Sequence, residues 1–131
     1  MLPVTALFAS ILTLFYIKLA LDVIKLRRSN RVSLGSGGVD TLEKAIRVHG
    51  NFAEYVPLGL VLMGLLETNG GYPWLVAVLG ATLSVGRVLH ARALLGQPGK
   101  LRVRGMQLTF GTLATLAVLN LLLVVRSHVG A

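Results

Sequence analysis

The chain has no cysteine among its 131 residues. This absence excludes disulfide bonds, thiolate metal sites, covalent haem attachment and a cysteine nucleophile, so any thiol chemistry must come from a ligand. The three histidines, His49, His90 and His128, are spread over separate segments of the chain. Because ligands of one metal ion must converge on one point, we predict no metal site.

Charged residues are also scarce. They make up 14% of the chain, against 54% apolar residues, and the mean hydropathy is +0.75. These values are atypical of a soluble domain and indicate an integral membrane protein. Acidic residues are the rarer charge, with five Asp and Glu against 13 Lys and Arg. In a soluble protein this excess would suggest nucleic acid, but here we predict the lipid bilayer as partner and no nucleic acid.

Four apolar segments are each long enough to cross a bilayer, which takes about 20 helical residues. They lie at residues 2–26, 40–66, 74–95 and 105–125, in one domain that covers residues 1–131. The first segment lacks a basic leader and is too long for a signal peptide, so we expect a permanent span. The predicted fold class is an all-α integral membrane protein with a four-transmembrane-helix bundle.

The connections between these segments differ in charge. Basic residues gather in residues 25–47 and 92–104, whereas the connection from Glu67 to Trp74 has no Lys or Arg. By the positive-inside rule, both basic connections lie in the cytoplasm, and both termini lie outside. Lys18 and Asp22, four residues apart near the end of the first segment, are expected to pair at the membrane boundary.

The second segment carries a polar cluster where a lipid-crossing helix normally tolerates none. An ionisable residue at membrane depth faces a protein interior or a water-filled cavity, and it marks a functional site by default. At 100° per residue, four of the side chains fall within an arc of about 80°, and a fifth lies at its edge. They are Glu43, Arg47, Asn51 and Glu54, with Tyr55 at the edge.

Basic side chains recur near the same end of the other segments. Arg87 and His90 lie three residues apart on the third segment, and Arg102 and Arg104 precede the fourth. Guanidinium groups bind carboxylates bidentately and tolerate partial burial, so we predict a recess for a small anion with several carboxylates. An alternative for Arg87 is a structural ion pair with Glu54.

His49 lies about 200° around the helix from Glu43, so it cannot line the same recess from the same side. It is either an interior histidine or a sign that the second helix lies between two sites in an oligomer.

The run of residues 47–57, with Arg47, Asn51 and Glu54, resembles the Arg, three residues, Asn, two residues, Glu signature of the MAPEG family. These are membrane-associated proteins in eicosanoid and glutathione metabolism. Residues 86–90, 30–33 and 100–104 support the resemblance, which covers the whole chain in length, number of spans and order of motifs.

The resemblance implies a homotrimer that binds glutathione between neighbouring subunits, near the cytoplasmic side. In that arrangement, one subunit supplies most of the binding residues and the next supplies two, which would account for the direction of His49. The first set is Arg47, Asn51, Glu54, Arg87, His90 and Arg104, and the second is Arg31 and His49. Tyr55 is a further candidate for binding glutathione.

The activity implied by the resemblance is that of a microsomal-type glutathione transferase or peroxidase in detoxification, located in a bacterial inner membrane. Positive charge lowers the pKa of a thiol and so raises the fraction of nucleophilic thiolate. Arg104, with Arg31 as the alternative, is the candidate for stabilising the thiolate of glutathione. The second substrate would be an apolar electrophile that arrives from the bilayer.

Two positions depart from some members of the family. Leu94 stands where those members have a tyrosine, and Gly105 where they have a serine. This departure motivates a second hypothesis, a non-catalytic module that binds glutathione or another anion. A third hypothesis is a small proton-coupled multidrug transporter that uses Glu54, although Arg47 and Arg87 nearby would repel a cation.

Overall fold

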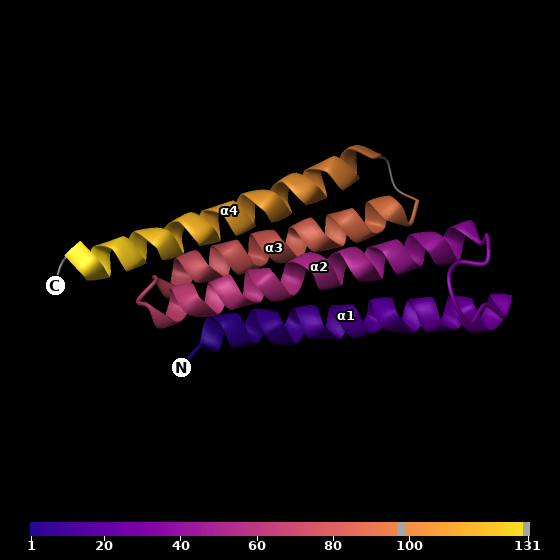
Figure 1. Cartoon of the computed structure of the whole chain (residues 1–131), viewed down its shortest axis with the longest axis horizontal. Helices are drawn as coiled ribbons and strands as arrows, with labels where there is room; N and C mark the ends of the chain where they lie inside the picture. Colours follow the sequence, from indigo (N-terminus) through magenta and orange to yellow (C-terminus); the bar gives the residue numbers. More distant parts are fainter. Residues whose placement is uncertain (97–98, 130–131) are drawn as a thin grey trace.

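The computed structural model describes residues 1–96 and 99–129, and this part of the chain forms four long helices and no strand (Figure 1). The helices are α1 (Pro3–Asn30), α2 (Asp40–Thr68), α3 (Pro73–Leu94) and α4 (Gly99–Val129). The predicted all-α bundle is therefore confirmed.

Turn chemistry explains three of the helix ends. Proline stands in the first turn of α1 and α3, where its missing N–H costs no helical hydrogen bond. Arg31 ends α1 in the left-handed conformation, and the glycines of the following loop, Gly35, Gly37 and Gly38, also have positive φ. The connection between the first two predicted segments thus contains a glycine-rich loop, although α1 continues past residue 26 to Asn30.

The predicted start of the fourth segment is wrong. Helix α4 begins at Gly99 instead of residue 105, so the basic residues 100–104 belong to the helix. The connection between α3 and α4 includes residues 97–98, which lie outside the described residues. At the start of α2, Asp40 makes no capping hydrogen bond with its side chain and forms an ion pair with Lys44 at 2.6 Å.

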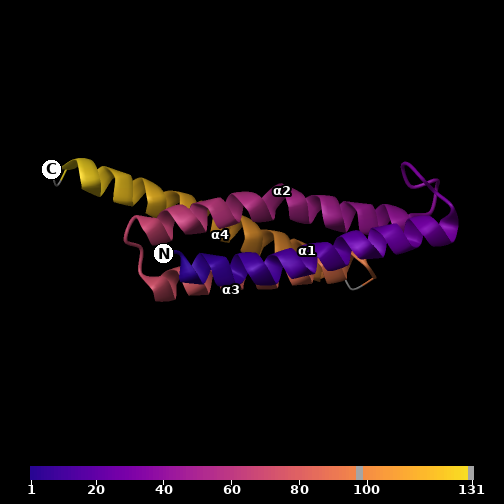
Figure 2. The ribbon, with the colours of Figure 1, turned by 90° about the horizontal axis from the view of Figure 1, so that it is seen from below.

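Three helices, α1, α3 and α4, are long and apolar enough to cross a membrane by themselves. Helix α2 is not one of these three, yet it runs beside the other helices along the bundle (Figures 1 and 2). The N-terminus and the end of α4 lie at the same end of the bundle (Figure 1). We call the opposite end, formed by residues 18–47, 90–96 and 99–104, the basic end.

Contacts between helices fix their relative positions. Helices α3 and α4 approach each other closely at Gly86 and Gly105, where a Cβ on Gly105 would lie 2.8 Å from the carbonyl oxygen of Gly86. At the end with the termini, the carboxylate of Glu67 accepts hydrogen bonds from the amides of Val4 and Thr5 at 3.0 and 2.8 Å. This carboxylate satisfies two amide groups that a helix start leaves unpaired, so it ties α1 to α2.

Candidate functional site

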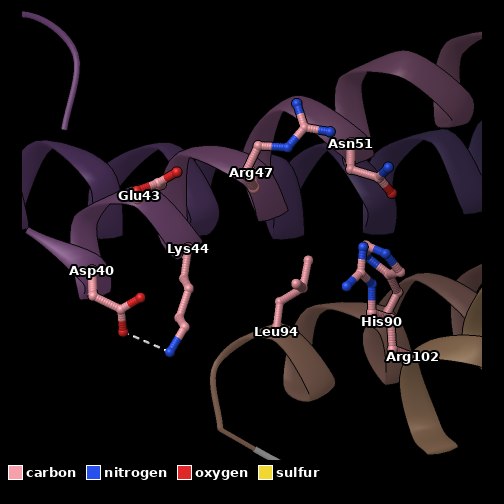
Figure 3. Close-up of a pocket in the computed structure, with 8 residues that line it drawn as sticks. All are labelled: Asp40, Glu43, Lys44, Arg47, Asn51, His90, Leu94 and Arg102. Carbon is pink, nitrogen blue, oxygen red and sulfur yellow. Dashed lines mark ion pairs between the residues drawn. The ribbon is translucent and has the colours of Figure 1, made fainter. Parts of the chain in front are cut away.

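A recess of about 310 Å³ opens at the basic end between α2, α3 and α4 (Figure 3). Its volume is at the lower limit of ligand pockets, which span about 300–1,000 Å³. The lining side chains come from all three helices: Asp40, Glu43, Lys44, Arg47, Asn51, His90, Leu94 and Arg102.

The charges around the recess are unequal. Asp40 and Lys44 form an ion pair on its rim, at 2.6 Å. The other charged side chains of the recess are Arg47 of α2, Arg102 of α4 and the carboxylate of Glu43. None of these three forms an ion pair within the described residues. Cations therefore outnumber carboxylates even with a neutral histidine, which favours an anionic or zwitterionic ligand.

Arg87 lies behind the recess and is only 2% exposed. Its guanidinium donates to the side-chain oxygen of Asn51 at 2.7 Å and to Thr109 Oγ1 at 3.1 Å. It also contacts Met106 Sδ at 3.4 Å and lies 5.4 Å from the ring centre of Tyr55. A buried charge needs such partners because leaving it unpaired is costly.

The contact with Arg87 orients the amide of Asn51. Because Asn51 Oδ1 accepts the hydrogen bond at 2.7 Å, Nδ2 is left as the donor that can reach a ligand in the recess. Tyr55 is held in turn between Arg87 and Phe110, whose ring centre lies 5.4 Å away. Arg87 and Tyr55 therefore support the recess from behind, and neither side chain lines it.

The alternative ion pair between Arg87 and Glu54 is wrong for a single chain. Glu54 is exposed, and the ion pairs within the described residues are Lys18–Asp22 and Lys44–Asp40, both at 2.6 Å. The physical reason is that Arg87 already finds neutral acceptors on α2 and α4. The predicted pair of Lys18 and Asp22 is confirmed.

His49 lies on the other side of α2, next to α1. Its ring stacks on Tyr16, with ring centres 4.6 Å apart, and its Nε2 is buried without a hydrogen-bond partner within the described residues. The expected direction away from the recess is thus confirmed.

The recess of one chain gathers Arg47, Asn51 and His90 from the predicted binding residues. It leaves out the exposed side chains of Arg31, Glu54 and Arg104, as well as His49.

Arg102 belongs to the basic residues from which the sequence predicted the recess, but not to the glutathione-binding set that the resemblance implied. It lines the recess, whereas Arg104 does not. Because Arg102 and Arg104 are two positions apart on α4, their directions differ by about 200° around the helix, and only one of them can face the recess. Helical periodicity could have separated Arg102 from Arg104 in the sequence, but only if the helix was known to begin before residue 100.

The two departures from the family pattern have different structural settings. Leu94 lines the recess, so the position remains part of the site without its hydroxyl. Gly105 is a packing residue, because a Cβ there would lie 2.8 Å from both Gly86 O and the backbone nitrogen of His90. Such contacts are too short for any side chain at residue 105 unless α3 and α4 separate.

The sequence of the chain also matches known proteins. The model of the MAPEG family matches residues 5–122, and the chain belongs to this family. It is also 38% identical over 118 residues to the inner membrane protein YecN of Escherichia coli K12, covering 90% of each chain. The YecN protein of Escherichia coli O6:H1 matches to the same extent.

Proposed function

We propose that this protein binds glutathione in the recess and transfers its thiolate to apolar electrophiles, as a microsomal-type glutathione transferase or peroxidase. The observation that carries the proposal is the convergence of Arg47, His90 and Arg102, from three helices, on one pocket at the basic end. Glutathione carries two carboxylates, an ammonium group and a thiol. Guanidinium groups suit its carboxylates, and Glu43 offers an acceptor for its ammonium group.

The proposal includes a homotrimer in a bacterial inner membrane, with the recess toward the cytoplasm and both termini outside. Support comes from the outward direction of the remaining polar residues. Glu54 and Arg104 are exposed in a single chain, and exposed charges at membrane depth require a protein or water partner. A neighbouring subunit would provide that partner, and its Arg31 and His49 would complete the site.

Arg104 is exposed outside the recess of a single chain. In the trimer it is the proposed thiolate-stabilising residue at the boundary with the neighbouring subunit, and Arg31 of that subunit is the alternative. Either guanidinium would lower the pKa of the bound thiol by favouring its charged form. The apolar electrophile would reach the sulfur from the bilayer.

The decisive experiment is calorimetric titration of the purified protein with glutathione. Arg47→Ala is expected to weaken binding by about tenfold or more, because a hydrogen bond to a charged group contributes about 1.5–3 kcal/mol. Arg92→Ala is the matched control, since Arg92 is an exposed arginine of α3 outside the recess. Equal affinity in the two variants would contradict the assignment of the recess.

Leu94 and Gly105 favour a second candidate function, binding of glutathione without turnover. Conjugation of glutathione to an aromatic halide separates the two functions. Wild-type turnover that is lost in Arg104→Ala supports the transferase. If glutathione binds but neither thiolate absorbance nor a conjugated product appears, the protein is a module that binds glutathione without turnover.

A further inference from the structure

A second basic feature lies on the outer face of α1, away from the recess. The exposed side chains Leu14, Ile17, Leu21 and Ile24 follow one another along this face, with 43–69% of each side chain exposed. At 100° per residue, they point within an arc of about 80°. Lys25 and Arg28 continue the same face at the basic end. An apolar stripe thus leads directly to two cations.

The stripe ends in a surface depression of about 610 Å³. Its walls combine apolar side chains and cations: Leu21, Ile24, Lys25, Arg28 and Ser29. Side chains three residues apart on a helix have Cβ atoms about 5–6 Å from each other, so Lys25 and Arg28 can both contact one phosphate group.

These two cations have no acidic partner. Within the described residues, the acidic side chain nearest in sequence, Asp22, is paired with Lys18 at 2.6 Å. The neighbouring Arg27 is different, because its Nη1 donates to the carbonyl oxygens of Ser33 and Gly35 at 3.3 and 2.9 Å. Arg27 therefore holds the loop after α1, whereas Lys25 and Arg28 are available for a ligand.

We propose that Lys25 and Arg28 bind the phosphate of an anionic phospholipid whose acyl chain lies along the apolar stripe of α1. The ligand is an amphiphile because the depression joins cations to apolar side chains on a single face. Lys and Arg next to a membrane span attract anionic lipid headgroups in general. The inference does not rest on glutathione binding, since the depression shares no residue with the recess.

The test uses the purified full chain in detergent, titrated with phosphatidylglycerol or phosphatidylcholine, with bound lipid counted by native mass spectrometry. The double variant Lys25→Gln/Arg28→Gln is expected to lose about thirtyfold in affinity for phosphatidylglycerol, or about fivefold for each charge. Its affinity for phosphatidylcholine is expected to stay unchanged.

The matched control is Arg92→Gln/Lys100→Gln, which removes two exposed charges from the same end of the bundle. Equal losses in both double variants would mean diffuse attraction and would overturn the site. Titration with inorganic phosphate tests whether the two cations bind free phosphate and not the headgroup of a lipid. Phosphate is expected not to displace the lipid at equal concentration, and displacement would show a site for free phosphate instead. Circular dichroism without added lipid checks that both variants keep the wild-type helix content.

Discussion

The two halves of α2 differ on one face and agree on the other. We call residues 40–55 the polar half and residues 56–68 the apolar half. The exposed side chains of the polar half include Glu43, Arg47 and Glu54. Those of the apolar half include Leu58, Val61 and Leu65. The inward face carries apolar side chains in both halves, and Asn51, which bonds Arg87, is its buried polar residue. The large apolar side chains buried on this face are Leu42, Val48, Phe52, Val56, Met63 and Leu66.

This difference shows that one helix can pack against the core along its whole length while its outward face meets two different environments, one polar and one apolar. Helix α2 keeps an unbroken run of helical residues through Pro57, and its inward face packs against the core in both halves. Its outward face changes from charged to apolar between Glu54 and Leu58. The recess lies beside the polar half, where water and anions can reach it.

The largest expected effect concerns the contact that holds α3 to α2 where the two halves meet. Arg87→Met removes the donors to Asn51 and Thr109, both buried. Leaving buried polar groups without partners is expected to lower the free energy of unfolding by about 2–3 kcal/mol. Denaturant titration in detergent micelles measures this change.

Arg92→Met is the control for this substitution, because Arg92 lies on the same helix and is exposed. It is expected to change stability by less than about 0.5 kcal/mol. If both variants unfolded at the same denaturant concentration, the buried network would have no structural role, and the two halves would be joined by apolar packing alone.

The second prediction tests the surroundings of the outward face directly. Glu43 and Val61 are five helical turns apart and point in the same direction, and the chain has no native cysteine to interfere. In membrane fragments open on both sides, Glu43→Cys is expected to react with a charged maleimide at least tenfold faster than Val61→Cys, because the reactive thiolate forms poorly without water. Equal rates would remove the division of α2 into two environments.

Much of this fold was predictable from the sequence, because hydrophobic length and charge asymmetry mark membrane helices well. Hydropathy locates the apolar region and not the helix ends, which is why residues 100–104 were assigned to a connection although they are helical. Because of this error, the sequence could not predict which of Arg102 and Arg104 faces the recess. Helical periodicity gave the polar arc of α2, but it could not reveal that Arg87 turns toward Asn51, since that contact depends on how α3 packs.

The smallest expected effect compares one glycine from each half of α2. A Cβ on Gly50 would meet no atom within 4 Å, whereas a Cβ on Gly59 would lie 2.8 Å from Cδ2 of the buried Leu83. Alanine favours helix over glycine by about 0.5–1 kcal/mol, so Gly50→Ala is expected to raise the free energy of unfolding by up to that amount. In Gly59→Ala, overpacking against Leu83 is expected to cancel the gain or reverse it slightly.

Denaturant titration of the two variants in the same detergent measures the difference. Since both substitutions add one methyl group to the same helix, differences in helix propensity largely cancel, and the remaining difference reports packing at the two positions. A gain of equal size in both variants would mean that α2 and α3 are loosely packed in the apolar half. In that case, tight contacts would be confined to other pairs such as Gly86 and Gly105, and the apolar half of α2 would be held mainly by its surroundings.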